Sequence, residues 1–149
     1  MPEGAGSGNW LGIDFGKRKL GLAVAHPLTG SARPLETLRY SEVTQLEAGL
    51  LRVIKEWRPA IIVVGLPLDG EGRDTDMSRR VRAFIERLAS LAPMAEIRLH
   101  DERLTSHAAA GAFAERREQG RARRRDAAHL DSLAAALILD SWIAEHDHA

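Results

Sequence analysis

At 149 residues the chain has the length of one domain with a sizeable core, and its apolar (44%) and charged (28%) fractions are those of a globular protein. Lys and Arg balance Asp and Glu at 21 each, so the molecule as a whole is not a basic nucleic-acid binder. The lack of cysteine excludes disulfides and thiolate metal sites and is typical of the cytoplasm, where we expect the protein. No apolar run approaches the roughly 20 residues of a membrane span, and no secretion signal is evident.

The first strong pattern is a β-hairpin with an acidic residue in its first strand. Apolar residues alternate with glycine and Asp14 from Leu11 to Gly16, which is the period of a half-buried strand. A charged turn at 17–19 leads to a second apolar strand at 20–25. A carboxylate in such a hairpin requires a compensating partner. Asp14 is therefore either hydrogen-bonded to a neighbouring loop, or a metal ligand or catalytic acid that acts with other carboxylates.

The remaining elements follow from apolar periodicity and from Gly and Pro positions. They are, in chain order, a strand at 32–38, a helix at 43–57 with Ser41 as N-cap and Pro59 as its stop, a buried parallel strand at 60–65, a Gly- and Pro-rich loop at 66–72, a helix capped by Thr75 or Asp76 that ends before Pro93, a strand at 96–102, a helix at 107–118 and a last helix at 127–145. This order predicts an α/β domain with a mixed five-stranded sheet and helices on both faces. We expect a flexible tail at 1–9 and a single domain at 10–146.

Two further acids are candidates for a shared site with Asp14. Glu102 ends the fifth strand, and the carboxyl ends of strands are common site positions. Asp131 shares a helix face with Ala135, Ile138 and Trp142, so it is expected to point towards the sheet and to need a cationic partner. Taken singly, Glu102 is better read as a surface acid paired with Arg103 or Arg98.

Three such acids, without cysteine ligands, suit a hard cation such as Mg²⁺ or Mn²⁺. The histidines nearby in sequence have no close-spaced metal motif and are read as structural or exposed: His100, His107 and His129. No Gly-x-Ser-x-Gly nucleophile elbow is present.

Arginines gather in two places despite the neutral total charge. One group lies in a single helix, and the other lies within one ten-residue segment: Arg79, Arg80, Arg82 and Arg87, then Arg116, Arg117, Arg121, Arg123, Arg124 and Arg125. Such a cluster either holds a polyanion or forms a solvated surface.

Together these motifs resemble the YqgF family, also called RuvX, which is related to the RuvC Holliday junction resolvases. The resemblance covers about residues 11–144 and rests on four segments in order: Gly12–Gly16 with Leu20–Ala23, Val64–Leu68, Asp101–Thr105 and Asp131–Leu139. It implies a ribonuclease H-like fold. In two positions the chain departs from the family pattern. Lys19 stands where an arginine is usual, and Glu71-Gly72 replaces the usual Asp-Gly of the central loop.

The resemblance implies a metal-dependent endonuclease that processes the 5′ end of precursor 16S ribosomal RNA, or a Holliday junction resolvase. Asp14, Glu102 and Asp131 would be both the catalytic acids and the ligands of Mg²⁺ or Mn²⁺, in a two-metal mechanism that leaves a 5′ phosphate. Backbone phosphates would be bound by basic residues without reading sequence: Arg18, Lys19, Arg103, Arg121, Arg123, Arg124 and Arg125. The expected partner is precursor rRNA or branched DNA, with no membrane partner, and the protein would act as a monomer or a homodimer.

Two other functions stay open at this point. The Asp14-x-Gly16 pattern also opens sugar kinases and actin-like ATPases, although those proteins need two such domains around a nucleotide. A non-catalytic nucleic-acid-binding member of the family would bind equally well after Asp14 is neutralised and would not cleave with any metal.

Overall fold

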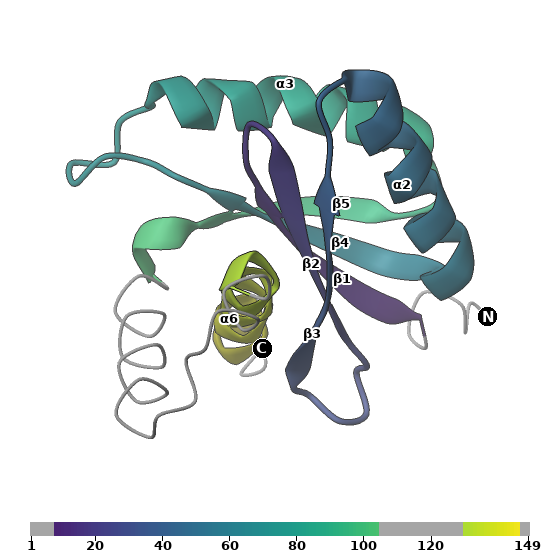
Figure 1. Ribbon diagram of the computed structural model, residues 1–149. Helices are drawn as coiled ribbons and strands as arrows, with labels where there is room; N and C mark the ends of the chain where they lie inside the picture. Colours follow the sequence, from purple (N-terminus) through teal and green to yellow (C-terminus); the bar gives the residue numbers. More distant parts are fainter. Residues whose placement is uncertain (1–7, 105–129, 147–149) are drawn as a thin grey trace, which may run out of the picture.

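A five-stranded sheet with α2 and α3 on one face and α6 on the other forms the frame of the computed structural model, which describes residues 8–104 and 130–146 (Figure 1). The elements are β1 (Asn9–Phe15), β2 (Lys19–Ala25), β3 (Ala32–Arg39), α2 (Val43–Trp57), β4 (Pro59–Leu66), α3 (Asp76–Leu91), β5 (Glu96–Asp101), the short 3₁₀ turn η1 (Glu102–Leu104) and α6 (Leu130–His146).

The strand order is β3-β2-β1-β4-β5, which places β1 at the centre. β1 pairs antiparallel with β2, and β2 pairs antiparallel with β3. β4 runs parallel to both β1 and β5. The mixed sheet with helices on both faces, as predicted from the order of elements, is confirmed.

The two faces of β1 carry different residues because successive side chains point to opposite sides of a strand. Leu11 and Ile13 are fully buried in the main core with residues of α2 and α3. Gly12 faces α6, where an added Cβ would lie 2.8 Å from the carbonyl oxygen of Ala135 and 2.9 Å from the Cβ of Leu139. α6 can therefore approach β1 this closely only because position 12 has no side chain.

Several predicted boundaries move by one or two residues. The N-cap of α2 is Glu42 and not Ser41. The side-chain oxygen of Gln45 accepts hydrogen bonds from the backbone N–H groups of Ser41 and Glu42, and the bond to Glu42 is one half of a capping box. The fifth strand ends at Asp101, one residue earlier than predicted, so Glu102 begins η1. Arg58, with a φ of 46°, ends α2 directly before β4.

Part of the prediction lies outside the described residues. This applies to residues 1–7 of the expected tail, to the helix predicted at 107–118 and to residues 127–129 of the last helix. β1 begins at Asn9, at the end of the range assigned to the tail. Within the described part of the chain, no helix is long and apolar enough to cross a membrane.

Candidate active site

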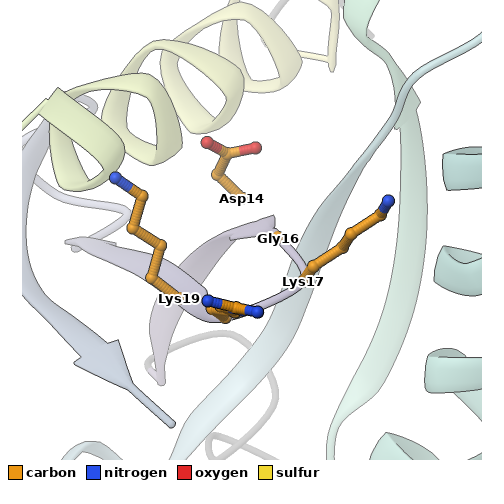
Figure 2. Close-up of a pocket in the computed structure, with 5 residues that line it drawn as sticks. Asp14, Gly16, Lys17 and Lys19 are labelled. Carbon is orange, nitrogen blue, oxygen red and sulfur yellow. The ribbon is translucent and has the colours of Figure 1, made fainter. Parts of the chain in front are cut away.

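Asp14 lies on the α6 face of the central strand. It is two residues after Gly12, which faces α6, and side chains two apart in a strand share a face. Figure 2 shows its carboxylate pointing towards that helix. Across the hairpin Asp14 is in register with Gly21, so a glycine lies on the β2 side of the acid. The acid predicted from the hairpin therefore points to the side of the sheet that the last helix covers.

Glu102 reaches the same face of the sheet from the end of β5. Ile13 is in register with Val64 of β4, so the following residues, Asp14 and Gly65, are neighbours on adjacent parallel strands. The carboxylate of Glu102 lies over Gly65: an ideal Cβ there would be 2.8 Å from Oε2 of Glu102 and 2.6 Å from Cδ1 of Ile138. Gly65 thus provides the space in which the Glu102 carboxylate lies beside the position of Asp14.

Burial raises the pKa of Glu102, and the neighbouring charge of Asp101 raises that pKa further. A half-buried carboxylate with a raised pKa is stabilised in its ionised form by a nearby cation. Both acids present only oxygen donors, which are the ligands that Mg²⁺ and Mn²⁺ prefer. The two residues therefore fit a hard divalent cation.

The third predicted acid, Asp131, lies in the first turn of α6, but its side chain lies outside the described part of the structure. Its helix neighbours behave as the sequence predicts, since Ala135, Ile138 and Trp142 are buried towards the sheet. Among the described residues, no three His, Cys, Asp or Glu side chains form a group that could hold a metal ion. A three-acid site therefore remains a prediction that depends on Asp131.

The turn between β1 and β2 places basic residues next to Asp14. A hollow of about 400 Å³ is lined by Asp14, Gly16, Lys17, Arg18 and Lys19. Lys17 and Lys19 extend to opposite sides of the turn (Figure 2). An acid that could hold a cation, next to several basic side chains, is an arrangement that suits a phosphodiester, whose phosphate both groups can contact.

Tyr40 fixes the shape of this turn, a role that the sequence analysis missed. Its hydroxyl donates to the carbonyl oxygen of Gly16, and its backbone N–H donates to the carbonyl oxygen of Arg18 at 2.9 Å. Gly16 itself has no room for a side chain, because a Cβ would lie 2.7 Å from the carbonyl oxygen of Lys19. Nothing in the local pattern around Tyr40 pairs it with residues more than 20 positions earlier.

Arg103 links two loops at the same edge of the sheet. Its guanidinium donates to both carboxylate oxygens of Asp101, with Nη2 at 2.6 Å from Oδ2, and this ion pair lowers the pKa of Asp101. The same guanidinium lies over Gly72, where a Cβ would be 3.2 Å from it, and Nη1 is 3.5 Å from the carbonyl oxygen of Gly70. The predicted phosphate-binding Arg103 therefore also ties η1 to the loop after β4.

Other predicted residues are placed differently or lie outside the described chain. His100 is buried and shares a hydrogen bond of 2.9 Å with Ser141, in line with the structural role predicted for it. His107 and His129, and the arginines of the second cluster, lie outside the described residues: Arg116, Arg117, Arg121, Arg123, Arg124 and Arg125. The role of Gly65 was also missed, because the sequence shows only a glycine at the end of an apolar strand.

The fold is that of Holliday junction resolvases. A structure of Thermus thermophilus RuvC in complex with a Holliday junction substrate matches with a TM-score of 0.62 at 22% identity, over 93% of this chain and 96% of that one. The fowlpox virus Holliday junction resolvase matches with a TM-score of 0.55 at 10% identity, over 92% of this chain and 98% of that one. These identities are low, so the likeness establishes the fold alone. The predicted ribonuclease H-like fold is confirmed.

Sequence comparison identifies the family. The model of the RuvX family, described as Holliday junction resolvase, matches residues 8–145, and the chain belongs to this family. A Pseudomonas paraeruginosa protein named "Putative pre-16S rRNA nuclease" is 42% identical over 136 residues, covering 91% of this chain and 92% of that protein. The protein of the same name from Escherichia coli O157:H7 is 39% identical over 137 residues, covering 91% and 96%.

Proposed function

We propose that this protein is a divalent-metal-dependent endonuclease that processes the 5′ end of precursor 16S rRNA. The observation that carries the proposal is the placement of Asp14 and Glu102 at neighbouring positions on one face of the sheet, next to the basic β1–β2 turn. The family, and relatives named for a pre-16S rRNA nuclease that align with 91% of the chain, supply the substrate.

In this proposal each residue of the site has a separate task. Asp14, Glu102 and Asp131 would hold two divalent ions. When bound, the metal would supply activation of the attacking water and neutralisation of charge at the cleaved phosphate. Glu102 must be ionised to take part, and its burial makes this unfavourable until positive charge arrives.

The turn and Arg103 would bind the strand on either side of the reacting phosphate. Arg18 and Lys19 line the hollow beside Asp14 and would contact backbone phosphates, as would Arg103 and the arginines at 121 and 123–125. Such contacts raise affinity and fix the position of the strand without reading its sequence. Because an ammonium is a point charge without the planar fork of a guanidinium, Lys19 would attract a phosphate but not clamp it in two places.

A Holliday junction resolvase is the second candidate, and the family description together with the RuvC-like fold supports it. The two candidates differ in the assembly that they need. Symmetric cleavage of a four-way junction requires two active sites related by a two-fold axis, and so a homodimer, whereas a monomer suffices to cut one RNA strand.

The decisive experiment is cleavage of end-labelled precursor 16S RNA and of a four-way DNA junction in Mg²⁺, in Mn²⁺ and in chelator. We compare the wild type with Asp14→Asn, and with Asp76→Asn as a matched control, since Asp76 is a fully exposed acid at the start of α3. We expect metal-dependent cleavage by the wild type and Asp76→Asn, and the chelator background for Asp14→Asn. Equal cleavage by Asp14→Asn would refute the proposed site, and absence of wild-type cleavage with intact binding would indicate a non-catalytic protein.

A further inference from the structure

A second hollow, of about 310 Å³, lies on the face of the sheet opposite to the one that Asp14 faces. We call it the α2–α3 groove, because its lining residues come mainly from α2 and α3, with Phe15 from the end of β1. These two helices lie on the same face of the sheet (Figure 1). It is lined by the apolar residues Phe15, Leu46 and Phe84, and by the charged residues Lys17, Arg80, Arg87 and Glu47.

The apolar lining of the groove is partly aromatic. The rings of Phe15 and Phe84 are stacked, with centroids 4.6 Å apart and planes 27° from parallel. Leu46 and Phe84 belong to the buried core, and Val43, which also lines the groove, is 57% exposed. A surface of this kind suits a flat ring with apolar faces, such as a nucleobase, which gains from stacking regardless of its identity.

The charged lining of the groove has a net positive charge. Neither Lys17 nor Arg80 forms an ion pair within residues 8–104 and 130–146, whereas Arg87 pairs with Glu47. Positive charge beside an apolar lining complements one kind of ligand in particular, an unpaired nucleotide whose base is apolar on its faces and whose phosphates are anionic.

The groove and the hollow beside Asp14 share one lining residue, Lys17. Asp14 and Phe15 are consecutive residues of β1 that point to opposite faces. Tyr40 also lines the groove while its hydroxyl holds the turn at Gly16. A nucleic-acid strand that runs from Asp14 to the groove would therefore pass Lys17.

We propose that the α2–α3 groove binds one unpaired nucleotide of the substrate strand, with the base over Phe15 and Phe84 and the phosphates against Lys17 and Arg80. The inference rests on the proposed function in so far as the substrate is nucleic acid. It adds a requirement for single-stranded substrate next to the cut, because bases paired in a duplex do not expose their faces for stacking on a side chain.

Tyr40 makes the groove directly observable, because it is the only tyrosine in the chain. The full chain with isotope-labelled tyrosine is titrated with a short single-stranded RNA in the presence of chelator. The control titration uses a strand of the same length that is abasic throughout. We expect saturable shifts of the Tyr40 ring signals with the RNA and much smaller shifts with the fully abasic strand. Equal shifts with both would overturn the proposal, because the phosphates alone would then account for binding.

Two variants test the charged and the apolar lining without removing core side chains. Arg80→Glu reverses a charge of the groove, and Arg79→Glu is its matched control on the same helix, outside the groove. Ala83→Trp fills the groove from an exposed position on α3. We expect Ala83→Trp to weaken binding of single-stranded RNA by roughly five- to a hundredfold, which is the range for loss of one stacked base. Arg80→Glu is expected to weaken binding because its carboxylate repels the phosphates, and Arg79→Glu is expected to bind as the wild type within about twofold.

The outcomes separate this proposal from the proposed nuclease function, since binding in chelator does not depend on catalysis. Base-dependent Tyr40 shifts without any cleavage would support the groove and refute the nuclease. Normal cleavage together with wild-type RNA affinity in Ala83→Trp would refute the groove alone. If Arg80→Glu or Ala83→Trp changed the oligomeric state in sedimentation and left RNA affinity unchanged, the groove would be an interface between copies of the chain, which also overturns the proposal.

Discussion

Replacing Gly65 by alanine is expected to disable the site by displacing the Glu102 carboxylate. The new Cβ would lie 2.8 Å from Oε2 of Glu102 and 2.6 Å from Cδ1 of Ile138, both closer than the 3.0 Å that real Cβ contacts respect. Both of these atoms are the ends of flexible side chains, so the protein can fold if they move. Such overpacking costs typically about 1–3 kcal/mol of unfolding free energy.

The effect on catalysis is expected to be larger than the effect on stability. The Glu102 carboxylate must leave the space above Gly65, and a displacement of about 1 Å at a reacting centre costs on the order of a hundredfold in rate. Cleavage of precursor 16S RNA is measured at saturating Mg²⁺, together with Mn²⁺ affinity by calorimetry and unfolding in urea. Gly49→Ala is the matched control. Gly49 lies in α2 on the opposite face of the sheet, and the atoms nearest to its new Cβ would belong to the side chain of Leu38, at 3.1 and 3.2 Å.

A double-mutant cycle decides whether Gly65 acts through Glu102. In a Glu102→Gln background, Gly65→Ala is expected to change Mn²⁺ affinity little, because the ligand that it displaces has already been lost. The reasoning is refuted if Gly65→Ala is folded and fully active. It is also refuted if Gly65→Ala weakens Mn²⁺ binding by the same factor with and without the Glu102 carboxylate.

Three further predictions concern the framework of the site. Burial raises the pKa of Asp140 above its usual value, although the Ala32 N–H that donates to it at 2.7 Å lowers that pKa in part. Ionisation of Asp140 therefore destabilises the folded state, and this loss of stability grows as pH rises from the pKa of the unfolded chain through the pKa of the folded protein. Asp140→Asn keeps an acceptor for Ala32 and is expected to raise the thermal midpoint at pH 7, with the gain shrinking towards pH 4. Arg103→Ala is expected to speed amide hydrogen exchange at Gly72, since the guanidinium that covers this loop is lost. Thr75→Ala removes the N-cap of α3 and is expected to cost about 1 kcal/mol, a decrease of about 2–4 °C in thermal midpoint.

Each of these has its own contradicting result. A lower midpoint for Asp140→Asn at pH 7 would mean that the carboxylate charge stabilises the fold. Unchanged exchange at Gly72 in Arg103→Ala would show that the loop keeps its shape without the guanidinium. Thr75→Ser, which retains the hydroxyl, serves as control for the cap, and an equal loss of stability in Thr75→Ser would exclude the hydrogen bond from Ser78 as the cause.

The sequence by itself determined the kind and order of the elements. The alternation around Asp14, the apolar run of β4 and the Thr75 cap are local signals, because they depend on residues within one or two turns of each other. The same local signals placed Asp14 in the first strand of a hairpin and Glu102 at the end of the last strand to within one residue. Ser41 was assigned wrongly as a cap because Gln45, three residues into the helix, selects Glu42 instead.

Only the tertiary structure decided which residues share a site. The register between β1 and β4 places Asp14 beside Gly65, and the path of the chain after β5 brings Glu102 over that glycine. The contact of Tyr40 with Gly16 and the groove formed by α2 and α3 likewise join residues that are far apart in sequence. Periodicity in the sequence indicates which face of an element is apolar. The pairing of distant strands and the packing of helices on them are non-local, and this pairing and packing determine where the acidic residues meet the basic side chains of the β1–β2 turn.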